Sequence, residues 1–172
     1  MVRHAAEAAS TMSDSRNAAP APAAPSGAVD PAAGEHVFPV RVYYEDTDAA
    51  GIVYYVNYLK FAERARTEML RLLGRQQQQM MDADGVAFAV KSARVEYFRP
   101  ARLDDALAVR TGLIEVAGAS LKVRQRIFRG GELLADMQIR LAVMDKSGRP
   151  TRLPADIRAA LAPSADPSRA MP

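Results

Sequence analysis

Two changes in the spacing of apolar residues constrain the fold of this chain more than any other feature. From Asn57 to Leu73 the apolar side chains recur at steps of three and four residues, which predicts an amphipathic helix. After Gly85 they alternate instead, which predicts strands. Asn57 is a candidate N-cap, and Gly74 stands where the end of the helix is expected. The pattern therefore predicts one long helix followed by a run of strands.

The predicted strands are long and have short connections. The first strand after the helix changes phase between Val90 and Ala93, which indicates a bulge, and Arg129-Gly130-Gly131 is typical of a hairpin. Short connections favour antiparallel pairing. We therefore predict an α+β fold in which one helix covers an antiparallel sheet of about five strands, with open edges that favour dimerisation. The alternating segments are residues 37–44, 86–97, 107–113, 121–127 and 133–143.

The two ends of the chain differ from its middle in composition. Residues 1–35 are rich in Ala, Pro, Ser, Gly and Asp without apolar periodicity, so we predict a disordered tail, with a partner-binding arm as the functional alternative. Residues 36–162 are predicted to form one folded domain, and residues 163–172 a shorter flexible tail. A chain of 172 residues with 49% hydrophobic content can build a sizeable single core.

Composition excludes several classes of function. The chain has no cysteine, which excludes disulfides, zinc–thiolate sites and a cysteine nucleophile. The formal charge of +3 is too small to indicate nucleic-acid binding. Because acidic residues outnumber basic ones before residue 36, the rest of the chain is more positive, which mildly favours an anionic ligand such as a nucleotide-bearing thioester. No apolar run reaches about 18 residues and no signal-peptide pattern is present, so we expect no membrane span and a cytoplasmic location.

Three acidic residues lie just before the predicted helix. Glu45, Asp46 and Asp48 fall in its preceding turn, and turn formation alone is a sufficient role for them. Asp48 differs from the other two because the small residues Ala49–Gly51 follow it and leave room for a substrate. The free N–H groups of a helix start can polarise a carbonyl oxygen. A carboxylate beside such donors suits attack on an activated carbonyl.

Neither histidine belongs to this segment. His4 lies in the predicted tail and His36 at the edge of the first strand, so neither a Ser-His-Asp triad nor a histidine metal site is expected. A carboxylate would have to act without a histidine partner. Thioesters permit this, because a leaving thiol with a pKa of about 8.5 needs little protonation. The residues therefore favour thioester hydrolysis with no metal or organic cofactor.

Three segments carry a resemblance to a known family: YYEDTDAAGIVYYVNYLKFAERARTEML, VEYFRPARLDD and SLKVRQRI. They resemble the hotdog-fold acyl-CoA thioesterases of the 4-hydroxybenzoyl-CoA thioesterase type, and within them the YbgC-like, Tol-Pal-associated branch. The resemblance covers about residues 37–147. It implies a hotdog fold, homodimers often paired into homotetramers, and active sites at the subunit interface. It also implies acyl-CoA or acyl-carrier-protein thioesters as substrates.

The resemblance further implies the roles of individual residues. Asp48 is expected to be the catalytic carboxylate, which either attacks the thioester carbon or activates water. The backbone N–H of Tyr55 is expected to bind the thioester oxygen, and Gly51 to let the turn approach the ligand. Phe88 and Val90 are expected to line the acyl pocket from the neighbouring subunit.

The chain departs from the family pattern at two places. Tyr55 stands where many YbgC-like sequences have histidine, which leaves the role of Asp48 intact but removes any histidine-assisted step. Residues 116–119 replace the basic cluster that binds CoA phosphates in the hydroxybenzoyl-type enzymes, so other cations must serve. For these candidates a solvated position on a strand is the plainer role. They are Lys91, Arg94, Lys122 and Arg124.

Other interpretations stay open. Some hotdog enzymes use a helix glutamate as base, but Glu63 has Lys60 and Arg66 at ion-pair spacing, which favours an ion pair. A non-catalytic acyl-binding or scaffold protein of the same fold is the alternative function. A hotdog hydratase ranks last, because it normally needs an Asp–His pair. The tyrosines near the turn are expected to pack as aromatic bodies with hydroxyls at the rim; they are Tyr43, Tyr44, Tyr54 and Tyr58.

Overall fold

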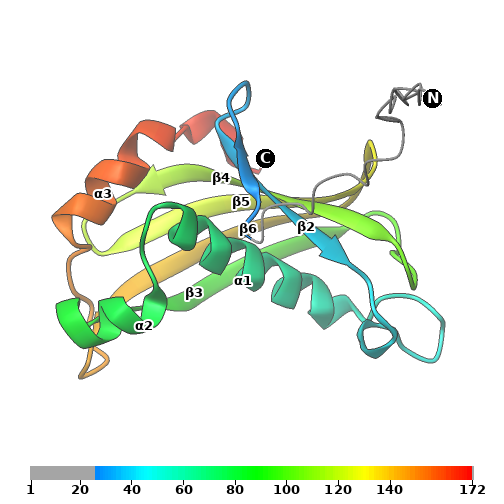
Figure 1. Cartoon of the computed structure of the whole chain (residues 1–172), viewed down its shortest axis with the longest axis horizontal. Coiled ribbons are helices and arrows are strands. Elements are labelled where there is room, and N and C mark those ends of the chain that lie inside the picture. The colour runs from blue at the N-terminus through cyan, green and yellow to red at the C-terminus, as the bar shows by residue number, and fades with distance from the viewer. Residues whose placement is uncertain (1–25, 172) are drawn as a thin grey trace, which may run out of the picture.

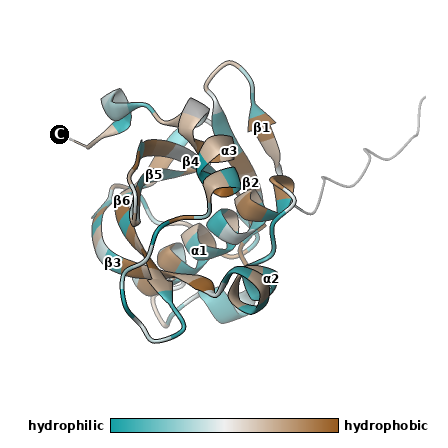
Figure 2. Cartoon of the chain, turned by 90° about the vertical axis from the view of Figure 1, so that its left-hand side faces the viewer, coloured by the Kyte–Doolittle hydropathy of each residue, from teal (hydrophilic) through white to brown (hydrophobic). Residues whose placement is uncertain are grey.

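The computed structural model describes residues 26–171, which form a six-stranded antiparallel sheet curved around one long helix (Figure 1). The strand order is β1-β2-β4-β5-β6-β3, and α1 lies in the hollow of the sheet (Figure 2). The predicted α+β class and the hotdog arrangement are confirmed. The strands are β1 (Ala28–Asp30), β2 (Glu35–Arg41), β3 (Val86–Tyr97), β4 (Ala106–Val116), β5 (Ser120–Arg129) and β6 (Glu132–Asp145). The helices are α1 (Tyr55–Leu72), α2 (Gln77–Gln79) and α3 (Ala155–Leu161), with shorter turns η1 (Tyr44–Asp46), η2 (Met80–Asp84), η3 (Ala162–Ser164) and η4 (Pro167–Arg169).

Strand β3 does not pair with the strand that follows it in sequence. It pairs with β6 at one edge of the sheet, whereas β4 lies between β2 and β5. Every pairing is antiparallel as expected, but the short connection from β3 to β4 does not join paired strands. The N–H of Phe98 still bonds to Leu134 O on β6, but the Ala101 carbonyl already accepts from Val53 N, near the start of α1. The short connection thus crosses the open end of the sheet. The bulge is confirmed, between Val90 and Ser92.

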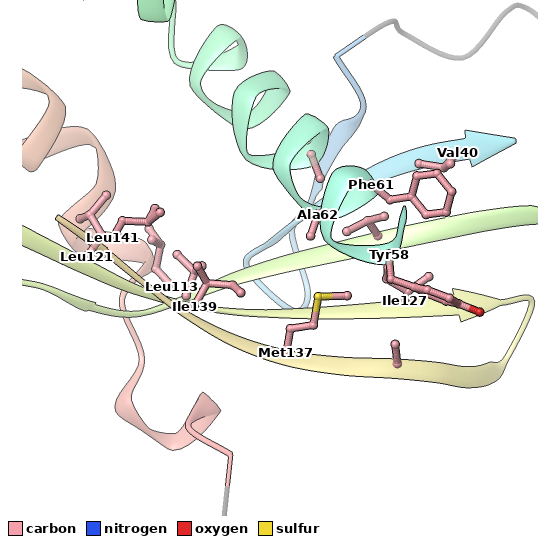
Figure 3. Packing of buried hydrophobic residues seen from close by; sticks show 14 of the residues in the cluster. Val40, Tyr58, Phe61, Ala62, Leu113, Leu121, Ile127, Met137, Ile139 and Leu141 are labelled. Carbon is pink, nitrogen blue, oxygen red and sulfur yellow. The ribbon is translucent and has the colours of Figure 1, made fainter. Parts of the chain in front are cut away.

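The core lies between α1 and the concave face of the sheet. Phe61, Ala62 and Ala65 on α1 are fully buried, and the sheet meets them with branched side chains of β4, β5 and β6 such as Val109 and Ile127 (Figure 3). Full burial of a ring such as Phe61 contributes about 2–3 kcal/mol. The small side chains of Ala62 and Ala65 let the sheet come close to the helix backbone. As a result, Gln125 on β5 can donate a hydrogen bond to the Ala62 carbonyl of α1.

The start of α1 differs from the prediction. The helix begins at Tyr55 with Tyr54 as N-cap, so Asn57 is not the cap. Asn57 is instead buried one turn inside the helix, where its Nδ2 donates to the Asp46 carbonyl at 2.9 Å. The side chain therefore ties the helix to the preceding turn. Gly74 follows the end of the helix with φ of 72°, the left-handed conformation expected of a helix stop.

Both predicted tails have ordered parts. β1 pairs with β2 inside the stretch expected to be disordered, so the predicted boundary at His36 lies too late, while residues 1–25 lie outside the described part of the chain. Near the other end, the Arg169 guanidinium donates to the carbonyls of Ala33 and Ser164, both at 2.6 Å. These segments are held by hydrogen bonds to the sheet and to each other rather than by apolar periodicity. Composition alone could not reveal that.

Candidate active site

The turn between β2 and α1 is organised by Asp46. This residue is only 4% exposed, and its carboxylate accepts from the Tyr43 N–H at 2.9 Å. Its carbonyl accepts from Tyr54 N and from the side chain of Asn57, both at 2.9 Å. Asp46 thus has the turn-forming role that the sequence allowed for all three acidic residues. It fixes the first residues of α1 relative to the loop that carries Asp48.

Asp48 lies on an exposed loop directly before α1. Its Oδ1 accepts from Ala50 N at 2.8 Å, its own N–H donates to Ile52 O, and its carbonyl accepts from Gly51 N. Gly51 has φ of 71°, which side-chain-bearing residues rarely adopt. The loop therefore holds the carboxylate by its own backbone and leaves it reachable from outside the chain.

The first turn of α1 presents N–H groups to the same region. No side chain caps this helix start, so the first amide, that of Tyr55, keeps its donor for water or a ligand, whereas the Asn57 N–H already donates to the Tyr54 carbonyl. The partial positive charge of a helix N-terminus adds to the attraction of the Tyr55 N–H for a developing oxyanion. The Tyr97 hydroxyl donates to the Tyr55 carbonyl at 3.0 Å and so links β3 to this first turn. Sequence reasoning missed Tyr97, because nothing in the alternation of β3 distinguishes it from a packing residue.

Tyrosines surround the helix start. The rings of Tyr54 and Tyr55 lie 4.8 Å apart, and those of Tyr58 and Tyr97 lie 5.5 Å apart. A hydrogen bond with Tyr55 and the nearby charge of Asp48 raise the pKa of Tyr54, and burial raises the pKa of Tyr58. The ring of Tyr58 packs as expected, but its hydroxyl is buried rather than at the rim and accepts from Ala101 N at 2.8 Å, and the expected packing is wrong for the exposed Tyr43, Tyr44 and Tyr54. Tyr54 is thus a neutral phenol near pH 7 that lies close to the Asp48 carboxylate.

Phe88 and Val90 line one apolar pocket of about 110 Å³ between α1, α3 and the strands β3, β5 and β6, which we call the front pocket. Val90, on the edge strand, is 53% exposed and also lines an open groove that reaches Val56 at the start of α1. Asp48 lines neither cavity. The front pocket is lined by Glu63, Arg66, Met69, Leu70, Gln77, Phe88, Val90, Leu121, Val123, Leu141 and Leu161.

Glu63 does not form the ion pair that its spacing favoured. Its Oε1 accepts from the Thr67 hydroxyl at 2.8 Å, whereas Arg66 turns inward and donates to Gln125 Oε1 at 2.6 Å. Gln125 is fully buried on β5 and donates in turn to Ala62 O and Thr111 Oγ1. Arg66 thus donates to the buried amide of Gln125 rather than to the carboxylate of Glu63. Helix spacing could not show this, because the partner lies on a strand.

Most of the candidate phosphate-binding cations already have acidic partners. Arg94 pairs with Glu96 at 3.0 Å, Lys122 with Glu115 at 3.5 Å, and Arg124 with Asp136 at 2.5 Å. That last contact raises the pKa of Arg124. Lys91 is exposed beside the bulge of β3 and has no ion pair within residues 26–171. Among the four candidates, Lys91 is the one best placed for an added anion.

The structure separates His36 from the Asp48 loop. His36 is buried on β2 and lines a small cavity with Met69, Leu72 and Leu73, at the opposite end of α1. A triad with Asp48 is therefore excluded for this histidine, and His4 lies outside the described residues. Within residues 26–171 no cluster of three or more His, Cys, Asp or Glu side chains could hold a metal ion.

Known proteins resemble this chain over most of its folded part. Residues 42–161 match the model of the thioesterase-like superfamily. The chain is 44% identical to the acyl-CoA thioesterase YbgC of Haemophilus influenzae over 72% of its length and 91% of that protein. It is 47% identical to the acyl-CoA thioester hydrolase YbgC of Escherichia coli over 70% of its length and 90% of that protein.

A solved structure agrees with these sequence relatives. A probable thioesterase from Bartonella henselae superposes with a TM-score of 0.68 at 34% identity, covering 70% of this chain and 99% of its own. The region that matches the superfamily model contains the Asp48 loop, α1 and the four strands β3 to β6. The chain belongs to the thioesterase-like superfamily of hotdog proteins.

Proposed function

We propose that this protein hydrolyses acyl-CoA thioesters to the free acid and CoA, with Asp48 as the catalytic carboxylate and the Tyr55 N–H as a donor to the thioester oxygen. The observation that carries the proposal is the placement of Asp48 on a loop that leads directly into an uncapped helix start. The YbgC relatives named above are acyl-CoA thioesterases, which supports the same reaction for this chain. Acyl-carrier-protein thioesters share the reacting group and stay a second predicted substrate.

The chemistry needs few groups. In one route an Asp48 oxygen bonds to the thioester carbon, the C–S bond breaks, and water then hydrolyses the resulting anhydride. In the other route Asp48 takes a proton from water as the water oxygen attacks the same carbon. In both, negative charge grows on the carbonyl oxygen, where one well-placed N–H donor is worth about 3 kcal/mol. The thiolate leaves without a dedicated acid, because its conjugate thiol has a pKa of about 8.5.

The proposed site needs a second copy of the chain. Met69 in the front pocket lies about 20 Å along α1 from Tyr55, at 1.5 Å per residue. Two chains with antiparallel α1 helices would bring the Asp48 loop of one protomer to the front pocket of its partner. We therefore propose a homodimer, with a homotetramer as a further assembly. Within residues 26–171 no helix is long and apolar enough to cross a membrane, and a cytoplasmic location stays a prediction.

The test measures thiol release from a series of acyl-CoAs by wild type and by Asp48→Asn. The variant keeps the shape of the side chain and removes its charge, so we expect kcat to fall about a thousandfold or more, with a modest change in KM. Glu45→Gln is the matched control, because Glu45 is an exposed acid of the same turn, and it should keep wild-type turnover. Comparable turnover in Asp48→Asn would refute the assignment.

One observation favours a non-catalytic acyl-binding protein as the second candidate. Three of the four candidate cations for CoA phosphates are occupied by acidic partners, which indicates weak recognition of the nucleotide. The same substrate series separates the two functions. Binding of acyl-CoA without release of free thiol at any chain length would favour the scaffold.

A further inference from the structure

A second cavity lies directly behind the front pocket, at the end of the molecule where α1 ends and α3 covers the sheet (Figure 1). We call it the rear pocket; His36, Leu72, Leu113 and Ser164 are among the residues that line it, and its volume is about 60 Å³. Met69 and Leu161 line both pockets. Two side chains thus form the wall between the cavities.

The strands confirm that the two cavities are neighbours. Leu121 pairs with Leu141 across β5 and β6, and both line the front pocket. Leu113, of the rear pocket, faces Val123 of the front pocket across β4 and β5. Figure 3 shows Leu113 beside Leu121 and Leu141. Because Met69 and Leu161 line both cavities, we infer that movement of their side chains would join them.

Of the two dividing residues, Met69 is the one able to move. Leu161 is 3% exposed at the end of α3 and belongs to the main core. Met69 is only partly buried, and methionine has an unbranched, flexible side chain that adapts to irregular gaps. We therefore assign the mobility of the wall to Met69.

The volumes translate into acyl chain lengths. A cavity of about 150 Å³ holds the six carbons of benzene, or about 25 Å³ per carbon. On that scale the front pocket, at about 110 Å³, holds about four carbons beyond the thioester carbonyl. The rear pocket, at about 60 Å³, adds two or so. Both pockets together hold about seven carbons beyond the carbonyl, the length of a linear octanoyl group.

His36 is a buried polar residue that lines the rear pocket. Its Nε2 lies 2.7 Å from Ser26 O, a group that only accepts, so Nε2 carries the hydrogen and Nδ1 is an acceptor when the ring is neutral. Burial lowers the pKa of His36, which favours that neutral form. Nδ1 is buried without a hydrogen-bond partner among the described residues. A longer chain would meet the buried ring of His36, which lines this pocket, and this sets an upper limit to chain length.

We propose that Met69 is the gate of a two-part acyl pocket and that it sets the chain-length specificity of the enzyme, which accepts linear acyl groups from butanoyl to octanoyl. This inference rests on the proposed thioesterase function and adds the substrate class to it. Each methylene transferred from water into the rear pocket should raise kcat/KM about fourfold, the equivalent of about 0.8 kcal/mol. Beyond octanoyl the gain should end.

The experiment measures kcat/KM for butanoyl-, hexanoyl-, octanoyl-, decanoyl- and hexadecanoyl-CoA. Met69→Phe should close the gate and lower the octanoyl-to-butanoyl ratio about tenfold or more, while Met69→Ala should hold it open and raise that ratio. Met69→Leu keeps the bulk of the side chain and should keep the wild-type profile. Met81→Ala is the matched control, since Met81 is an exposed methionine outside both pockets.

The outcomes separate failure of the gate from failure of the function. Wild type that cleaves hexadecanoyl-CoA as fast as butanoyl-CoA would overturn the size limit. Met69→Phe and Met69→Ala with the same octanoyl-to-butanoyl ratio as Met81→Ala would overturn the gate, even though hydrolysis itself is intact. Wild type that releases no thiol from any acyl-CoA would instead overturn the proposed function.

Discussion

Replacement of Gln125 by leucine tests whether a polar network inside the core holds α1 on the sheet. Gln125 is fully buried, accepts from Arg66 Nη1 at 2.6 Å, and donates to Ala62 O at 2.8 Å and Thr111 Oγ1 at 2.9 Å. Leucine is of similar size but makes none of these bonds. Burial lowers the pKa of Arg66, which shows that this guanidinium is poorly solvated and depends on its partner.

The size of the effect follows from the bonds lost. The hydrogen bond to a charged group contributes about 1.5–3 kcal/mol, and loss of the bond to Thr111 costs about 1 kcal/mol more. Gln125→Leu should therefore lower the free energy of unfolding by about 2.5–4 kcal/mol, a large share of the 5–15 kcal/mol typical of a domain. For a domain of this size the melting temperature should fall by about 10 °C.

Urea unfolding followed by circular dichroism measures this free energy. Thr111→Val is the companion variant, because it removes only the hydroxyl partner and should cost about 1 kcal/mol. In the double variant that cost should largely disappear, since Gln125→Leu has already broken the shared bond. A Gln125→Leu protein within 1 kcal/mol of wild type, or full additivity with Thr111→Val, would refute the network.

Two further predictions concern acid stability and the Asp48 loop. Burial lowers the pKa of His36 below 6.5, so the unfolded chain binds a proton on this ring at pH values where the folded chain does not. Its contribution to stability should be complete above pH 6.5 and decline as the pH falls below it; unfolding free energies between pH 5 and 8 should show this slope, and His36→Phe should reduce it. Gly51→Ala should cost about 1–2 kcal/mol, from backbone strain alone, because a Cβ there meets nothing within 4 Å. Thermal melting measures that cost, and an unchanged melting temperature would contradict the left-handed conformation.

The spacing of apolar residues predicted where the helix and strands lie better than it predicted which strands pair in the sheet. The three- and four-residue steps located α1, and the change of phase located the bulge near Val90. The order of the strands was not predictable in the same way, because a short connection limits distance and not direction. The hydrogen bond from Val53 N to Ala101 O fixes the segment between β3 and β4, and it joins residues nearly fifty positions apart in the sequence. Local pattern holds no information on such a contact.

Turn chemistry predicted part of the candidate site. The position of Asp48 before a helix start followed from its small neighbours and the helical pattern after them. The small residues after Asp48 set it apart in the sequence, but the structural role of Asp46 could not be predicted, because its buried contacts join backbone groups that no local pattern brings together. The boundary between the front and rear pockets was likewise out of reach. Met69 reads only as one more apolar position of the helix.

The edge strand β3 connects the shape of the fold to its proposed chemistry. Its 12 residues pair on one side only, with β6, and Val90 is exposed. A long unpaired edge invites another strand. In the homodimer we propose, two-fold symmetry would set β3 against its copy and reverse the direction of the second α1. The uncapped start of one helix, with Asp48 before it, would then face the partner's front pocket. In this proposed dimer the same second chain would both cover the edge of β3 and complete the site.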